Sequence, residues 1–136
     1  MNIISKYDGY FHDGSIYDIC HEDNVIVISM GSAEIVDEEI MQNIILSKDS
    51  TIMGKLHIEG VHKLSVGGFI VDDKFKMLSK DSDIFDFDVK GNRVSFDIIW
   101  LDFSRTDLPT REVGFSVIEI EAEKIWWENL PDMVVD

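Results

Sequence analysis

The chain has 136 residues, 45% of them hydrophobic, which is enough for one domain (residues 1–136) with its own buried core. Its 12 basic and 27 acidic residues give a formal net charge of −15, which repels phosphate backbones and anionic membranes. The hydrophobic content argues against disorder, and the negative charge argues against nucleic acid or a membrane surface as the partner. It favours encounter with a basic partner, although it could also serve only solubility.

The N-terminal stretch Tyr10 to Met30 predicts a β-hairpin with its turn at residues 23–24. The register sets Tyr17 opposite Met30 on a face rich in isoleucine. The other face is partly apolar too and includes Cys20, so we expect the hairpin to be central in its sheet and Cys20 to be a core residue.

Residues 37–46 (DEEIMQNIIL) leave helix and strand open, because their isoleucines have helical spacing in a short, β-branched segment. Residues 51–61 predict a strand.

The clearest local pattern is Asp83 to Trp100, where apolar and polar residues alternate on both sides of a turn at residues 91–92. The register pairs Phe87 with Phe96 and Phe85 with Ile98. It also places Asp86 directly opposite Asp97, which is unfavourable unless the two carboxylates are well solvated or a cation lies beside them.

The last predicted strand is Glu112 to Glu123, in which the apolar parity changes between Val117 and Ile118. A bulge there would restore one buried face, with Val113 and Phe115 on it, and would leave Glu119, Glu121 and Glu123 on the exposed side. Short strands joined by hairpin turns predict a mainly β fold, an antiparallel sandwich or barrel with at most one or two short helices.

Two candidate sites involve histidine. His12 and Asp13 supply a base and a carboxylate, but Asp13-Gly14 is a turn dipeptide, so we interpret Phe11 to Gly14 as the anchored start of the first hairpin. The four histidines do not have metal-ligand spacing, and we expect neither a metal nor another cofactor.

The remaining candidates are aromatic and acidic side chains. Trp100, the adjacent pair Trp126 and Trp127, and His12 could form a ligand site at a barrel mouth; of the two adjacent tryptophans, one would be core and the other a lip. The candidate partner-binding residues are the acidic ones on the predicted outer faces: Asp86, Asp88, Asp97, Glu119, Glu121 and Glu123.

The stretch Phe11 to Ile35 resembles small bacterial proteins that begin with Phe- or Trp-His-Asp-Gly/Ala followed by two apolar strands. Here the matching residues are Phe11, His12, Asp13 and Gly14. Some such families look like the immunity proteins of polymorphic-toxin systems, which bind and block a cognate toxin. The resemblance covers 25 of the 136 residues, and no family site is carried over from it.

We therefore expect a non-catalytic, acidic protein-binding domain, with an immunity-type inhibitor of a basic toxin as one form of it. The alternative is a β-barrel that binds a small molecule or carbohydrate, or an enzyme. The N-terminus lacks the pattern of a secretory signal, there is one cysteine, and no apolar run reaches about 18 residues, so we expect a cytoplasmic protein.

Overall fold

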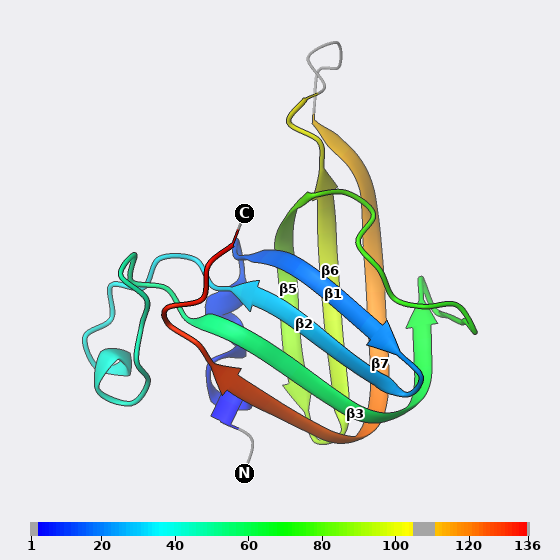
Figure 1. Cartoon of the computed structure of the whole chain (residues 1–136), viewed down its shortest axis with the longest axis horizontal. Helices are drawn as coiled ribbons and strands as arrows, with labels where there is room; N and C mark the ends of the chain where they lie inside the picture. The colour runs from blue at the N-terminus through cyan, green and yellow to red at the C-terminus, as the bar shows by residue number, and fades with distance from the viewer. Residues whose placement is uncertain (1–2, 105–110, 136) are drawn as a thin grey trace.

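The computed structural model describes residues 3–104 and 111–135, which form one antiparallel β-sheet with short 3-10 helices (Figure 1). The strands are β1 (Ser15–Glu22), β2 (Val25–Gly31), β3 (Met53–Val66), β4 (Phe69–Ile70), β5 (Asp81–Lys90), β6 (Arg93–Leu101) and β7 (Glu112–Asn129). The 3-10 helices are η1 (Ile3–Lys6), η2 (Asp8–Phe11) and η3 (Ile40–Gln42). The predicted mainly β, antiparallel fold class is confirmed, and the sheet is not closed into a barrel.

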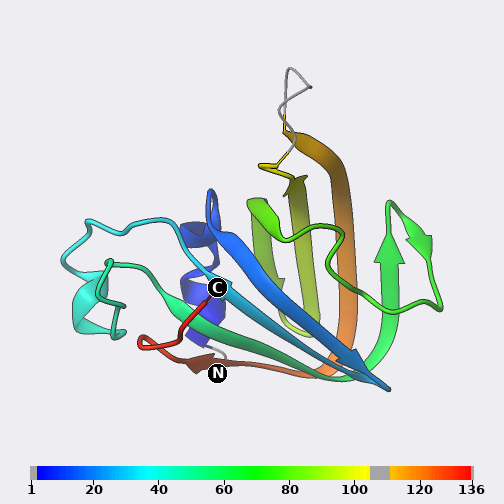
Figure 2. The same cartoon turned by 45° about the horizontal axis from the view of Figure 1, so that its top comes forward.

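The sheet has the strand order β1-β2-β3-β7-β6-β5, and β4 pairs with the end of β3. It folds over on itself, because β3 and β7 are long and run through both layers (Figures 1 and 2). At the bend in β3, Gly60 has φ of +67°, a value that glycine adopts without strain, and the register shifts between Val61 and Lys63. One layer thus holds β1 and β2, and the other holds β5 and β6.

The core lies between these two layers and is built from side chains that alternate with outward-facing ones along the strands. Ile26 and Ile28 of β2 and Phe96 and Ile98 of β6 are fully buried. Phe87 of β5 stacks on Phe96 with ring centroids 4.7 Å apart. Each such side chain stabilises the fold by about 1.5–3 kcal/mol relative to an exposed position.

The N-terminal segment closes the side of the core at which β1 meets β5. Phe11 is fully buried between Phe87 and Trp127, with ring centroids 5.2 and 5.7 Å away. The Asp13 N–H donates to the Ile84 carbonyl, and the Ile84 N–H donates to the Gly14 carbonyl, both at 2.8 Å. Phe11 to Gly14 therefore anchors the first hairpin, as predicted, and also fastens it to β5.

Both predicted hairpin turns are confirmed, at residues 23–24 and 91–92, as is the predicted register beside them. Farther from the turn, each edge strand contains a bulge. In β1, Ile16 rather than Tyr17 lies opposite Met30, so the predicted place of Tyr17 is wrong. In β5, Ile84 rather than Phe85 lies opposite Ile98.

Two further expectations are wrong, and the structure decides the one segment whose type the sequence left open. The first hairpin is not central, because β1 is an edge strand of the sheet. Cys20 is exposed and not a core residue, because it lies opposite Val27, which alternates with the buried Ile26 and Ile28. Within residues 37–46 the only helical structure is the short η3, from which Ile40 and nearby Ile44 reach the core.

Candidate protein-binding surface

The outer face of β5, β6 and β7 brings the two predicted opposing carboxylates together. Asp86 lies opposite Asp97 across the hairpin, as predicted, and Asp97 lies opposite Val117 of β7. Asp86 accepts a hydrogen bond from the Phe87 N–H at 3.1 Å. Among the residues with described coordinates, no basic side chain forms an ion pair with Asp86 or Asp97.

Burial is the main cause that raises the pKa of Asp97 above its ordinary value of 3.8, and the nearby charge of Asp86 raises it further. Both effects disfavour the ionised carboxyl group. A cation placed between the two carboxylates would oppose the effect of the Asp86 charge on Asp97. This part of the surface therefore favours a positively charged group.

Three of the other four predicted partner-binding carboxylates have basic neighbours. Asp88 lies 3.7 Å from Lys90, Glu119 lies 4.0 Å from Arg93, and Glu121 lies 3.1 Å from Lys63. The sixth, Glu123, is exposed and lies at the bend, against the backbone of Gly60. The surface is therefore less uniformly acidic than the sequence indicates, because three of the six predicted carboxylates lie beside a basic side chain, whereas Asp86 and Asp97 face each other without one.

Sequence reasoning missed the apolar part of this surface. Phe85, Phe115 and Val117 are 52%, 51% and 46% exposed, and the two phenyl rings lie 6.4 Å apart. Together with Asp86 and Asp97, these three residues form what we call the docking face.

The cause of the error is the register of β7. No bulge separates Val117 from Ile118, because the β6–β7 pairing is continuous there; the register shift lies near Val113, between the partners Trp100 and Leu101. Ile118 and Ile120 consequently face the core, and Val113, Phe115 and Val117 face outward. The change of parity at Val117 was the sequence signal for an apolar outer face.

The alternative ligand-site residues do not converge. Trp100 is fully buried and its indole N–H donates to the Ser116 hydroxyl at 2.9 Å, so it cannot stack on a ligand. Trp127 belongs to the core and Trp126 lies on the outer face of the first layer, which confirms the predicted split of this pair. The indole ring of Trp126 already has a stacking partner, because the His57 ring lies on it with ring centroids 4.0 Å apart.

His12 lies apart from these tryptophans, where the start of β1 meets β5. Its Nδ1 contacts the Phe85 carbonyl oxygen, and its Nε2 lies 3.7 Å from an Asp13 carboxylate oxygen. Asp13 is held by the backbone bond to β5 and has φ of +67°. His12 and Asp13 therefore hold the start of β1 against β5, in agreement with our interpretation of them as a structural anchor.

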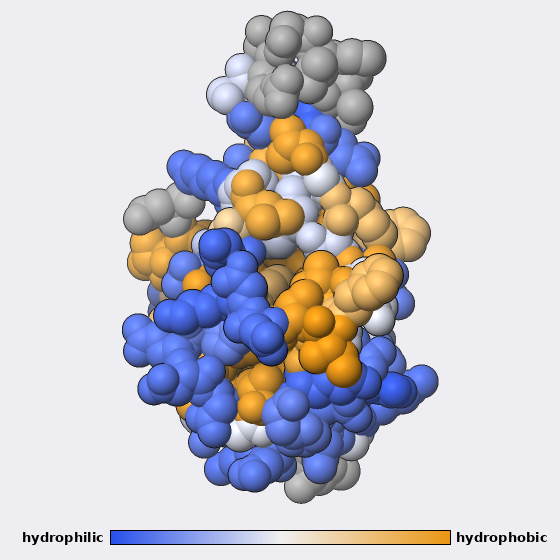
Figure 3. Space-filling model, turned by 90° about the vertical axis from the view of Figure 1, so that its right-hand side faces the viewer, coloured by the Kyte–Doolittle hydropathy of each residue, from blue (hydrophilic) through white to orange (hydrophobic). Residues whose placement is uncertain are grey.

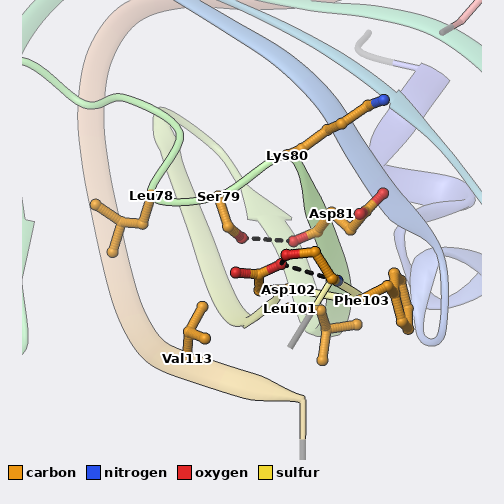
Figure 4. Close-up of a pocket in the computed structure, with 9 residues that line it drawn as sticks. Leu78, Ser79, Lys80, Asp81, Leu101, Asp102, Phe103 and Val113 are labelled. Carbon is orange, nitrogen blue, oxygen red and sulfur yellow. Dashed lines mark hydrogen bonds between the residues drawn. The ribbon is translucent and has the colours of Figure 1, made fainter. Parts of the chain in front are cut away.

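A cavity of about 550 Å³ opens at the end of the second layer, beside Val113 (Figure 4). Leu78 and Val113 are among its lining residues, and the Asp102 carboxylate accepts a hydrogen bond from the Ser104 N–H at 3.0 Å. It is open and its walls are mixed, and each buried side-chain N or O atom of the described chain has a hydrogen-bond partner. The Ser104 hydroxyl also donates to the same Asp102 oxygen, at 2.5 Å, within an exposed turn.

Across residues 3–104 and 111–135, no cluster of three or more His, Cys, Asp or Glu side chains is placed to hold a metal ion. The same residues contain no helix that is long and apolar enough to span a bilayer. Comparison of the chain with protein-family models, with curated proteins and with solved structures found no match.

Proposed function

We propose that the protein binds a basic protein partner through the docking face and acts by binding rather than by catalysis. The observation that carries this proposal is the exposure of Phe85 and Phe115 beside Asp86 and Asp97, two carboxylates without an ion-pair partner among the described residues. Aromatic side chains supply much of the energy at protein interfaces.

The arrangement of charge supports the same partner. The apolar centre is bordered by the paired charges of Asp88, Glu119 and Glu121, and interfaces commonly have an apolar centre with a polar rim. The net charge of −15 would accelerate encounter with a positively charged protein, and salt would weaken this steering. An immunity-type inhibitor that masks a basic toxin surface is the form of this function that we favour, on the resemblance of Phe11 to Gly14.

Affinity capture from a native lysate at low and high salt tests the proposal. The panel contains the unmodified protein, the double variant Phe85→Ser/Phe115→Ser, and Asp86→Asn/Asp97→Asn. A matched control, Asp18→Asn/Glu22→Gln, makes the same change of charge on exposed residues of β1 in the other layer.

We expect the unmodified protein and the β1 control to retain the same basic protein at low salt. The aromatic variant should bind the purified partner at least about tenfold more weakly, which corresponds to about 1.4 kcal/mol. Failure to retain any basic protein at low salt, or equal binding by the aromatic variant, would refute the proposal.

A further inference from the structure

The two-residue strand β4 leaves one edge of the sheet open beside the docking face. It pairs with β3 alone, outside the main strand order, and Figure 2 shows no strand beyond it. Its side chains Phe69 and Ile70 are 76% and 71% exposed. Aromatic and β-branched residues of this kind favour strand pairing.

The register determines which backbone groups point to the open edge. The turn Gly67-Gly68 separates Val66 from Phe69, and residues that flank a two-residue turn bond to each other. The N–H and C=O of Ile70 therefore point away from β3. Pairing with β3 resumes at Val71, whose N–H donates to the Leu64 carbonyl at 2.9 Å.

The opposite edge of the sheet, on β5, is sealed by comparison. The Val89 N–H donates to the Asp8 carboxylate at 3.0 Å, the Phe87 N–H donates to Asp86, and His12 contacts the Phe85 carbonyl. Proteins commonly block edge strands against pairing with other chains. Because the β5 edge is blocked in this way, the open apolar edge at β4 is a candidate site for pairing with a strand of another protein.

β4 is continuous with the docking face. The Gly67 N–H donates to the Val117 carbonyl at 2.8 Å, which places the β3–β4 turn against this docking-face residue. Ile70 lies opposite Ser65, and Ser65 lies opposite Glu119, so Ile70 is on the same outer face as Val117. Hydrophobic surface bordered by hydrophilic regions is visible on this side of the molecule (Figure 3).

We propose that the basic partner adds an extended segment to β4 as a further strand of the sheet, while its body covers the docking face. This inference rests on the proposed function. The occupant is a strand of a basic protein rather than a second copy of this chain, because each copy carries a net charge of −15 and two copies repel one another.

The test compares Ile70→Pro with Ile70→Ala, using the basic protein retained by the unmodified chain. Both substitutions shorten the side chain, but only proline removes the N–H. Proline is tolerated where the N–H of an edge strand faces solvent, so pairing with β3 should survive. We expect Ile70→Pro to bind about tenfold more weakly than Ile70→Ala.

A second measurement does not depend on a variant: hydrogen exchange of the Ile70 amide in the unmodified protein should slow when the partner binds. Equal affinity of the two variants together with unchanged exchange would overturn strand addition and leave the docking face intact. If the unmodified chain retains no basic protein, the docking function and strand addition both fail.

Discussion

Gly14 lets the Phe11 to Gly14 motif pack closely against neighbouring backbone at the start of β1. A Cβ atom at this position would lie 2.2 Å from the Gly31 carbonyl oxygen and 2.9 Å from the Phe11 carbonyl oxygen. Both neighbours are backbone atoms and cannot move aside as a flexible side chain can. The glycine is required because β1 begins where three segments of backbone meet.

We predict that Gly14→Ala lowers the free energy of unfolding by about 1–3 kcal/mol, the usual range for overpacking. Urea denaturation followed by circular dichroism measures it. Gly9→Ala is the matched control, because a Cβ there meets nothing within 4 Å, and its effect should stay within about 0.5 kcal/mol. Equal effects at the two positions would contradict this reading of the motif.

Asp97 gives a prediction with a definite pH dependence. Because its pKa is raised in the folded protein, first by burial and then by Asp86, its ionisation opposes folding. The stability it contributes is complete below the ordinary pKa of 3.8 and is lost as the pH rises through the folded-state value.

Asp97→Asn should therefore raise the free energy of unfolding at pH 7 by about 0.2–1 kcal/mol. The gain should shrink as the pH falls below about 4, near the ordinary pKa of aspartate. Urea titrations at several pH values measure both. Asp83→Asn, an exposed change on the neighbouring strand β5 opposite Ile99, should show no such gain, and a loss of stability in Asp97→Asn would contradict the prediction.

At the scale of elements, the sequence predicts the hairpins well close to their turns and poorly farther away. Turn chemistry and alternation determine the pairs Ile19–Ile28 and Phe87–Phe96. The bulges at Tyr17 and Phe85 depend on contacts between β1 and β5, such as the hydrogen bond from the Ile16 N–H to the Ser82 hydroxyl at 3.0 Å. Those contacts join residues far apart in the sequence, so local pattern does not contain them.

The segment between β4 and β5 is held over the core by a pH-sensitive contact. The Phe75 N–H donates to Nδ1 of His21 at 2.9 Å, so this nitrogen must be unprotonated. Burial lowers the pKa of His21 below 6.5, and the charge of Lys74 also lowers it, against an opposing hydrogen bond to the Asp23 backbone. The stability from this contact is present above pH 6.5 and is lost as the pH falls through the folded-state pKa.

We predict that the Phe75 amide loses hydrogen-exchange protection, after correction for the intrinsic rate, as the pH is lowered from about 7.5 to 5, across the ordinary histidine pKa. His21→Leu should remove this pH dependence. Protection that stays constant over the range in the unmodified protein would show that the contact does not hold the segment.

At the scale of the whole molecule, the fold class and the Asp86–Asp97 pair could be predicted from the sequence, whereas the docking face could not. Alternation predicts which residues share a face, but not which face is turned outward. Ile118 and Ile120 of β7 turn inward into the same buried core as the isoleucines of β2 and β6, and this leaves Phe115 and Val117 outside. Basic neighbours on other strands, such as Lys63 beside Glu121, are likewise set by the sheet order.

Hydroxyl-radical footprinting of the protein with and without its captured basic partner tests the central claim most directly, because it reports the exposure of individual side chains. Phe85 and Phe115 should be oxidised in the free protein and protected in the complex, while Tyr17 and Cys20, exposed on the other layer, should react equally in both. Protection of Tyr17 and Cys20 with unchanged oxidation of Phe85 and Phe115 would contradict the account.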